Sequence, residues 1–400
     1  MNRDNNNIIK QIVAVIFLAT LFLGFIKNGS NLAVDQYINY LKQYAYHSDG
    51  TLTLENIETN YTSKIWKHKE LVNLNGLLAK TLKMHGLYSD IGIYVTNDKY
   101  IVSASPYTTT DYEVDEIIAF RDFLKSNGIN LIYVNEPTKY IDDNMFKNEF
   151  GIETYSNRNM DVFLERINAA GVNTIDLRKN IEEEDLNISE LFYRTDHHWK
   201  TPTGLWASKV MAEGLNNYCG YSIDLSVFDE RNFIRNEWTE CWLGEQGRKV
   251  GSTYVGLDNY TELKPDFPTD YTFKKNNGST YDGTFDAFID EAVYNTENDI
   301  YENKSWHYSY RRLNCINNNI DNGKILLLCD SYDVVTQPFL SLQIHEMDSL
   351  VLRDYGDSFN LRDFIVSNGY DTVIIAYAQF MVGAHDNPSS ANYRMFTFDH

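Results

Sequence analysis

The 400-residue sequence has few basic residues, and this shortage limits the partners it can have. Lysine and arginine together number 35 against 56 aspartate and glutamate residues, which gives a formal net charge of −21. An acidic surface of this kind repels phosphate backbones, so the composition argues against nucleic acid as a partner. Hydrophobic residues make up 43% of the chain, which is enough to form a globular core and excludes wholesale disorder.

Cysteine is also scarce. The sequence has no Cys-x-x-Cys pair and no histidine at ligand spacing from a cysteine, so it predicts no zinc site. Outside the cytoplasm, four cysteines allow two disulfides in three connectivities, which the sequence does not distinguish. Cys329 lies in an apolar run and is typical of a buried free thiol. We therefore expect at most one disulfide, among Cys219, Cys241 and Cys315.

The N-terminal segment lacks an Ala-x-Ala-like cleavage site and a cysteine for lipid attachment. Its apolar stretch from Ile12 to Ile26 follows Arg3 and Lys10 and ends at Lys27. With the isoleucines just before it, this stretch approaches the ~20 residues that cross a bilayer as a helix. Residues 1–30 are predicted to be a membrane anchor or a cleaved signal segment, and the missing cleavage site favours the anchor. We expect a single-pass cell-membrane protein, or else a secreted one, with its C-terminal part outside the cytoplasm.

The remaining chain shows no repeat and divides by its pattern into two parts. Residues 31–110 form an N-terminal segment with helical stretches and a predicted hairpin between residues 91 and 102. Over residues 111–400, helices with an apolar face alternate with short apolar strands, which predicts a parallel sheet with helices on both faces. Residues 218–323 interrupt this alternation and are predicted to be an insertion of irregular strands and loops.

Two segments of the predicted domain carry side chains suited to catalysis. The first is Tyr193–Trp199, with the sequence Tyr-Arg-Thr-Asp-His-His-Trp. The second is Asp330–Ser331, directly after the apolar strand at residues 325–329. Active sites of parallel sheets lie at the carboxyl ends of the strands, and a serine on a tight turn there exposes its hydroxyl. The alternative for Ser331 is an ordinary turn serine, and the alternative for Tyr193–Trp199 is a packed or metal-binding loop.

A serine nucleophile needs a base, and the base needs an orienting carboxylate. In an extended loop, residues two apart project to the same side, so Asp196 and His198 are expected to act together. His197 is expected to point the other way. Because adjacent histidines diverge in an extended chain, the sequence favours no metal at this loop.

The string Arg-Thr-Asp-His-His-Trp-Lys at residues 194–200, followed by Leu-Leu-Leu-Cys-Asp-Ser-Tyr at residues 326–332, resembles the DHHW family. That family is similar to the SGNH-like domains of alginate O-acetyltransferases and related exopolysaccharide-acetylating proteins. The resemblance covers about residues 65 to 400 and includes Trp242–Gly251 and Leu352–Tyr355. It implies an SGNH-hydrolase-like, flavodoxin-like α/β fold.

The resemblance implies that Ser331 is the nucleophile, His198 the base and Asp196 its orienting acid. Their order along the chain is the reverse of that in most SGNH hydrolases, where the serine comes first. The Asp-x-His spacing replaces the commoner Asp-x-x-His, and both features fit the alginate-acetylating branch. In two respects the sequence departs from the family: Cys329 replaces the usual glycine before Asp-Ser, and Gln379 is the one carboxamide near the last strand where an asparagine often completes the oxyanion hole.

Six further positions are candidates for the oxyanion hole or for substrate contact. Oxyanion candidates are the Ser331 amide, the Gln379 side chain and a glycine amide of the 244–251 loop, among which Gly247 is the first choice. The alternative for Gly247, a plain turn glycine, is favoured over the oxyanion role. Candidates for substrate contact are Arg353, Tyr355, Trp199 and His197. The alternatives are a strand-end ion pair for Arg353, packing for Tyr355 and a core position for Trp199.

These features together predict an SGNH-type serine O-acetyltransferase or acetylesterase that acts on a cell-surface or secreted polysaccharide and needs no cofactor. The resemblance implies a multi-pass membrane O-acyltransferase as the acetyl donor. The rival hypothesis is a non-catalytic glycan-binding or polysaccharide-assembly protein that keeps the fold. A third is a structural surface protein held by the N-terminal segment.

The anchor generates the first testable prediction. The mature protein should retain its apolar N-terminal segment, because no cleavage site follows it. N-terminal sequencing of the protein from membrane fractions is expected to find residues that precede Ile12. A mature chain that starts near Ser30 would show cleavage and contradict the anchor.

Overall fold

The computed structural model consists of two compact units that divide between Leu78 and Ala79. It describes residues 19, 67–88, 92–275, 278–289, 314–356, 358–383, 388 and 391–398. The division falls inside the predicted 31–110 segment, and the predicted membrane anchor lies outside the described residues apart from residue 19. Within those residues no helix is both long and apolar enough to cross a bilayer. The first unit contributes the start of helix α4 (His68–Leu82), and every other element discussed below belongs to the second.

The second unit is built on a mixed sheet of eight strands in the order β5-β4-β13-β11-β12-β10-β8-β9. Five of them are parallel: β4 (Asn130–Glu136), β5 (Asn173–Asp176), β11 (Lys324–Leu328), β12 (Glu346–Leu350) and β13 (Thr372–Ala378). Every residue of β13 is buried, as expected for a strand covered on both faces. The predicted α/β class with a mostly parallel sheet is confirmed.

The parallel strands follow a permuted flavodoxin-like order. If they are numbered from β11 through β12, β13, β4 and β5, their order across the sheet is 2-1-3-4-5. The chain instead begins this set at β4, which amounts to a circular permutation. In sheets of this order the ligand crevice opens where the winding reverses, here between the carboxyl ends of β11 and β13.

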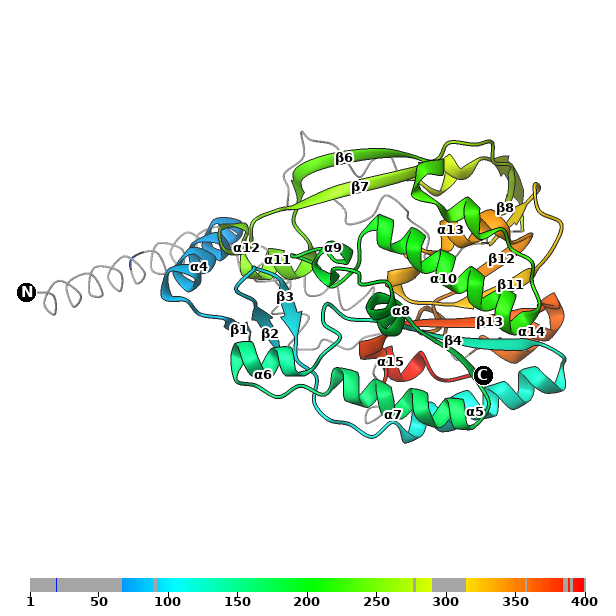
Figure 1. Cartoon of the computed structure of the whole chain (residues 1–400), viewed down its shortest axis with the longest axis horizontal. Helices are drawn as coiled ribbons and strands as arrows, with labels where there is room; N and C mark the ends of the chain where they lie inside the picture. The colour runs from blue at the N-terminus through cyan, green and yellow to red at the C-terminus, as the bar shows by residue number, and fades with distance from the viewer. Residues whose placement is uncertain are drawn as a thin grey trace, which may run out of the picture. The chain divides into compact units, whose positions relative to one another are not determined.

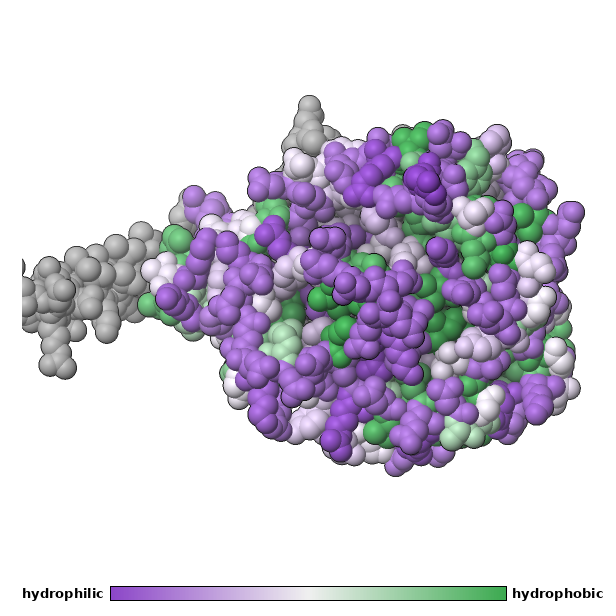
Figure 2. All heavy atoms as spheres, in the orientation of Figure 1, coloured by the Kyte–Doolittle hydropathy of each residue, from purple (hydrophilic) through white to green (hydrophobic). Residues whose placement is uncertain are grey.

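Helices cover both faces of the sheet (Figure 1). Helices α5 (Asp111–Ser126) and α7 (Ser156–Ala169) lie on one face, and α10 (Thr201–Cys219) and α13 (Gln337–Leu340) lie on the other. Helix α14 (Leu361–Asn368) joins the α5 face, where the Arg362 guanidinium lies 5.0 Å from the centre of the Phe123 ring. The side chains between helices and sheet form one large buried apolar cluster. On the face that Figure 2 shows, by contrast, hydrophilic residues cover most of the surface.

The region predicted as an irregular insertion is more regular than expected over its described residues. Strands β6 (Phe233–Trp242) and β7 (Asp258–Pro265) pair as an antiparallel hairpin. Strands β8 (Tyr271–Lys274), β9 (Thr280–Gly283) and β10 (Asn314–Asn317) then extend the central sheet beyond β12. Strands β8 and β10 alternate buried and partly buried positions, because they belong to an antiparallel edge rather than to the buried parallel centre.

The smaller elements surround the site edge of the sheet. The predicted hairpin between residues 91 and 102 is present as β2 (Ile93–Val95) and β3 (Ile101–Ser103), which β1 (Gly86–Tyr88) extends to three strands. The remaining helices are α6 (Asn144–Phe150), α8 (Leu177–Glu183), α9 (Ile188–Leu191), α11 (Glu245–Val250), α12 (Ser252–Val255) and α15 (Ala391–Arg394). All four cysteines are free thiols, so the structure contains no disulfide of the kind we allowed for, and Cys329 is buried as predicted.

Helix α10 packs closely against the chain that follows Ser331. The Ser208 hydroxyl donates a hydrogen bond to the Thr336 carbonyl oxygen at 2.9 Å. Four residues earlier, a Cβ atom built on Gly204 would lie 2.5 Å from the Val335 carbonyl oxygen. No side chain fits in that space, so Gly204 sets how near the helix approaches the turn that carries Ser331.

This contact predicts the effect of a single methyl group. Gly204→Ala should lower the free energy of unfolding by about 1–3 kcal/mol, because the backbone of residue 335 must move to accept the methyl. Gly356→Ala is the matched control, since nothing lies within 4 Å of its added Cβ. Urea unfolding followed by fluorescence measures both. A Gly204→Ala protein as stable as the control would show that the helix is free to shift.

Candidate active site

Asp196, His198 and Ser331 meet at the carboxyl edge of the sheet. The His198 Nδ1 atom lies 2.5 Å from the Asp196 Oδ1 atom, and the His198 Nε2 atom lies 2.7 Å from the Ser331 Oγ atom. Asp196 and His198 are buried, whereas Ser331 is partly exposed. The structure therefore brings together the three residues that the sequence nominated, in the order carboxylate, imidazole, hydroxyl.

The loop that carries Asp196 and His198 is fixed by strand β7. The Asp258 carboxylate at the start of β7 accepts hydrogen bonds from the Arg194 and Thr195 backbone amides, both at 2.9 Å. It also accepts one from the Thr195 hydroxyl at 2.5 Å. The Glu245 backbone amide, at the start of α11, donates to the Asp196 Oδ2 atom at 2.8 Å. The position of the acid is thus set by the β6–β7 hairpin and α11.

The environment keeps Asp196 ionised. Burial by itself raises the pKa of this carboxyl group, but the adjacent His198 and His197 rings and the Glu245 amide outweigh it and hold the pKa well below its usual range. An ionised Asp196 accepts the Nδ1–H of His198 and leaves Nε2 with a lone pair toward Ser331. This tautomer is the one that a general base requires.

The turn after β11 presents Ser331 to the base. The Asp330 Oδ1 atom accepts a hydrogen bond from the Tyr332 amide at 2.8 Å, and the Asp330 Oδ2 atom accepts one from the Ala378 amide at 2.7 Å. Ser331 then begins a short 3-10 turn, Ser331–Val334. In the part of the chain that the structure describes, the Ser331 backbone amide makes no hydrogen bond. An unused amide at the start of such a turn is suited to stabilise an oxyanion.

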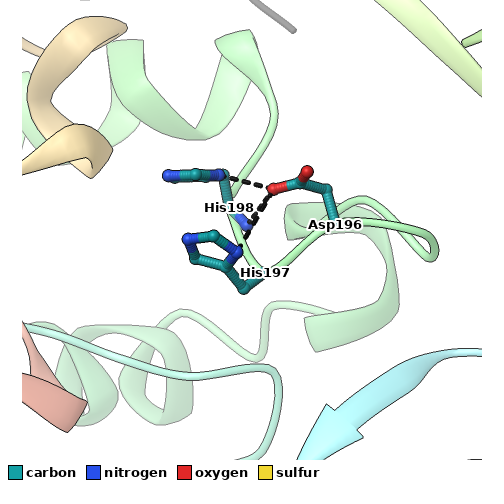
Figure 3. A group of neighbouring side chains, drawn as sticks. All are labelled: Asp196, His197 and His198. Atoms are coloured by element: carbon teal, nitrogen blue, oxygen red, sulfur yellow. Dashed lines mark hydrogen bonds and ion pairs between the residues drawn. The ribbon is translucent and has the colours of Figure 1, made fainter. Parts of the chain in front are cut away.

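His197 does not point away from the site, so that expectation was wrong. Its ring centre lies 3.8 Å from that of His198, and its Nδ1 atom lies 3.6 Å from the Asp196 Oδ1 atom (Figure 3). The prediction assumed an extended loop, but residues 194–198 form a continuous bend, which turns both rings to one side. Burial, together with the neighbouring His198, lowers the pKa of His197, so this ring is neutral at physiological pH.

Two of the three predicted oxyanion donors are already used elsewhere. The Gly247 amide donates to the Thr195 carbonyl oxygen at 2.7 Å, and a Cβ atom on Gly247 would lie 2.6 Å from the Thr195 Cβ. Gly247 is therefore a close-packing glycine and not an oxyanion donor. The Gln379 amide nitrogen donates to two side chains at the start of α7. Of the predicted donors, the Ser331 amide is left.

Two of the residues predicted to contact substrate, Trp199 and Tyr355, lie outside the active site. Trp199 is fully buried and donates from its indole nitrogen to the Tyr332 carbonyl oxygen at 2.9 Å, so it supports the nucleophile turn and cannot be a sugar platform. The Tyr355 ring packs against the Phe359 ring, with ring centres 4.3 Å apart, and lines a separate cavity of about 180 Å³. The walls of this cavity include neither the triad nor its chain neighbours His197 and Tyr332.

Arg353 lies just after β12, at the same edge of the sheet as Asp330. Burial raises the pKa of Asp330, whereas the hydrogen bonds from the Tyr332 and Ala378 amides and the positive charge of Arg353 oppose this rise. Arg353 thus acts on the nucleophile turn through its charge, and the structure shows no direct hydrogen bond from it to a carboxylate among the described residues.

Sequence reasoning missed two buried carboxyl groups beneath the nucleophile turn. Glu136 ends strand β4 and Asp333 follows Ser331 by two residues, and both are inaccessible to solvent. Burial, with the negative charges around it, raises the pKa of each well above its usual range. The pair therefore holds a proton in place of two charges. The available signals were Glu136 at the end of a buried strand and Asp333 two residues after Ser331, although β13 lies between β4 and the serine strand β11 in the sheet.

Among the residues that the structure describes, two groups of side chains have the composition of a metal site. In the first, Asp196, His197 and His198 offer ligand atoms within 4.8 Å of one another, but both ring nitrogens of His198 are already engaged by Asp196 and Ser331. In the second, Glu136 and Asp333 join Asp330, whose two oxygens each accept a backbone amide. A cation at either group would have to displace these hydrogen bonds.

A cavity of about 340 Å³ lies beside the triad, and we refer to it as the main cavity. His197 and Tyr332, the chain neighbours of His198 and Ser331, form part of its wall together with Phe380 and Lys139. Burial lowers the pKa of Lys139 to about 7, and its amino group donates to the carbonyl oxygens of Ile101 and Arg194. The walls are largely aromatic and apolar, as in pockets that accept small organic groups.

Residues 96–222 match the family model described as SGNH hydrolase-like domain, acetyltransferase AlgX. The predicted resemblance is confirmed. The matched segment holds strands β4 and β5 and the loop with Asp196 and His198. Comparison with curated protein sequences gives no significant match.

Solved structures share the fold at low sequence identity. Bacillus cereus PatB1 with a sulfonyl adduct is 20% identical with a TM-score of 0.58, over 77% of this chain and 100% of that chain. A second PatB1 structure gives 19% identity and a TM-score of 0.60, over 77% and 99%. A DHHW family protein from Eubacterium siraeum is 16% identical with a TM-score of 0.55, over 74% and 91%. At these identities the likeness shows a common fold.

The buried carboxyl pair predicts a pH-dependent stability. Because the folded protein keeps a proton that Glu136 and Asp333 release on unfolding above about pH 4, stability should fall as the pH rises from there toward the raised pKa. Glu136→Gln supplies a permanent N–H donor to Asp333 and so removes this dependence of stability on pH. From pH 5 to pH 8, thermal unfolding should show the variant losing at least about 2 °C less in Tm than the wild type. Glu165→Gln, on the exposed face of α7, is the control that should follow the wild type.

Proposed function

We propose that the protein is a serine-dependent acyltransferase or esterase with Ser331 as nucleophile, His198 as base and Asp196 as orienting acid. The supporting observation is the hydrogen-bonded series of Asp196, His198 and Ser331, with successive distances of 2.5 and 2.7 Å. A nucleophile within hydrogen-bond reach of a base, itself oriented by a buried carboxylate, is the arrangement that covalent acyl transfer requires.

The proposed reaction has two halves. The Ser331 Oγ atom attacks the ester carbonyl carbon while its proton passes to the His198 Nε2 atom, and the resulting oxyanion accepts a hydrogen bond from the Ser331 amide. His198 then protonates the departing alcohol oxygen, and the acyl group remains on Ser331. In the second half, His198 removes a proton from a sugar hydroxyl or water, which attacks the acyl-enzyme and restores free Ser331.

For the substrate we propose O-acetyl groups on a cell-surface or secreted polysaccharide. The match of residues 96–222 to an acetyltransferase domain supports the acyl group, and the main cavity beside the triad offers room for it. We further propose that the protein is held at the outer face of the cell membrane by residues 1–30 and receives acetyl groups from a multi-pass membrane O-acyltransferase. Tethering beside such a donor gives an effective concentration on the order of mM and favours transfer over hydrolysis.

Two observations favour the rival hypothesis, a non-catalytic glycan-binding or polysaccharide-assembly protein. Two predicted oxyanion donors, Gly247 and Gln379, are engaged elsewhere, and Cys329 stands where the family has glycine. Removal of one oxyanion donor typically costs about 10²–10³ in rate, so a site with a single amide donor is a weaker catalyst. Under this hypothesis Ser331 does not react with serine-directed reagents.

Covalent labelling separates the two hypotheses. Because Bacillus cereus PatB1 has been solved with a sulfonyl adduct, a sulfonyl fluoride is a suitable probe. We expect the Ser331 Oγ atom to displace fluoride and form a sulfonate ester, which peptide mass spectrometry locates at Ser331. Ser331→Ala should give no label and should lose at least about a thousandfold in turnover of 4-nitrophenyl acetate. His198→Ala should lose a similar factor.

The control is Ser126→Ala, which removes an exposed hydroxyl at the end of α5. It should be labelled and should turn over the ester like the wild type. A folded Ser331→Ala protein with full ester turnover would remove Ser331 from the mechanism. A wild-type protein that neither reacts with the probe nor turns over the ester would support the non-catalytic rival.

A further inference from the structure

A second, smaller cavity of about 90 Å³ adjoins the main cavity, and we refer to it as the side cavity. The two share Ser105 and Phe380 in their walls, so they follow one another along the surface. The side cavity is otherwise lined mostly by polar residues, among them Thr108, Ser156 and Gln379, and by none with a positive charge. The reaction described above makes no use of it.

The Gln379 side chain has a fixed orientation in the wall of the side cavity. It is 2% exposed, and its amide nitrogen donates to the Ser156 hydroxyl at 2.8 Å and the Asn157 Oδ1 atom at 3.1 Å. Asn157 presents its oxygen there because its own amide nitrogen donates to Asp143 at 2.9 Å. These contacts decide which end of the Gln379 carboxamide is nitrogen. Its Oε1 atom is left without a hydrogen-bond partner among the described residues.

A second oxygen atom in the wall of the side cavity also lacks a hydrogen-bond partner among the described residues. The Thr108 Oγ1 atom is shielded by the protein and has no partner in the part of the chain that the structure describes. The loop that carries it is held in place, since the Thr108 amide donates to the Asn159 Oδ1 atom and Asn159 donates back to the Pro106 carbonyl oxygen. Buried polar atoms in native proteins are nearly always hydrogen-bonded, so two such oxygens on one polar cavity point to a group that binds there.

We propose that the side cavity binds a hydroxyl-bearing substituent of a neutral sugar residue, next to the residue that is acylated in the main cavity. The inference rests on the proposed function and specifies its polysaccharide. The sugar hydroxyl donates hydrogen bonds to the Gln379 Oε1 and Thr108 Oγ1 atoms. One water-sized group needs about 10–15 Å³ by the same measure of volume. The side cavity, at about 90 Å³, therefore holds a few heavy atoms, such as those of a hydroxymethyl group. A whole second sugar does not fit in it.

The charge of the surroundings selects a neutral sugar over a uronic acid. Gln379 offers an acceptor oxygen, which repels a carboxylate. Glu113 lies close by, because its carboxylate accepts a hydrogen bond at 2.7 Å from the amide of Gly383, a residue of the cavity wall. No cation among the lining residues compensates this negative potential. A carboxylate entering the side cavity could accept a hydrogen bond from the Thr108 hydroxyl, but it would lose its hydration without meeting a cation among the lining residues.

The test measures binding apart from catalysis. Titration calorimetry compares Ser331→Ala with the double variant Ser331→Ala/Thr108→Val, using cellopentaose, xylopentaose, chitopentaose and a pentameric oligogalacturonate as ligands. Valine keeps the shape of threonine but lacks the hydroxyl. We expect at least one neutral oligosaccharide to bind more tightly than the oligogalacturonate, and its Kd to rise about three- to tenfold on Thr108→Val. Gln379→Met in the same background should raise that Kd similarly.

The control is Thr174→Val in the same background, where the lost hydroxyl donates to Asn168 on the exposed surface of the domain and the Kd should not change. An unchanged Kd in the folded Thr108→Val protein would overturn the inference. So would tightest binding of the oligogalacturonate, or binding of none of the neutral oligosaccharides. Turnover of 4-nitrophenyl acetate by the wild type is measured separately, so a protein that binds as expected without turnover would refute the catalytic proposal and leave the binding site standing.

Discussion

The carboxylate of Asp330 joins the two strands between which the sheet changes its winding direction. One oxygen holds the Tyr332 amide of its own turn and the other holds the Ala378 amide at the end of β13. This double contact fixes the turn so that the Ser331 hydroxyl faces His198 while the Ser331 amide stays unused. Burial, together with the negative charge of Asp330, also raises the pKa values of Glu136 and Asp333 well above their usual range.

The permuted order of the strands accounts for the unusual order of the triad along the chain. In a sheet that begins with the serine strand, the loop with the acid and the base comes last. Here β4 is the first of the parallel strands along the chain, so the loop after β5 precedes the serine strand β11. The neighbours of each parallel strand in the sheet are unchanged. The relative positions of Asp196, His198 and Ser331 depend on which strand ends lie side by side, and a permutation leaves these in place.

Local patterns in the sequence predicted the fold class and the three residues that meet at the site. Apolar runs predicted the buried strands, and the strand-end rule led to Ser331. The errors arose where tertiary contacts decide. The bend of residues 194–198, held by Asp258, turns His197 toward its neighbour, and no local pattern shows that bend. Gly247 lost its predicted role to a hydrogen bond with Thr195, a contact between segments far apart in the sequence.

The acid and the base share a single loop, and their separation is therefore a local property of a few residues. The loop is tied through Asp258 to the β6–β7 hairpin, so a displacement of the hairpin carries Asp196 and His198 as a rigid pair. Such a displacement alters one separation in the triad, that between the His198 Nε2 atom and the Ser331 Oγ atom. Two hydrogen bonds tie the same loop to the nucleophile turn and resist a change in that separation: the Trp199 indole donates to the Tyr332 carbonyl oxygen at 2.9 Å, and the Tyr332 hydroxyl donates to the His197 carbonyl oxygen at 2.6 Å.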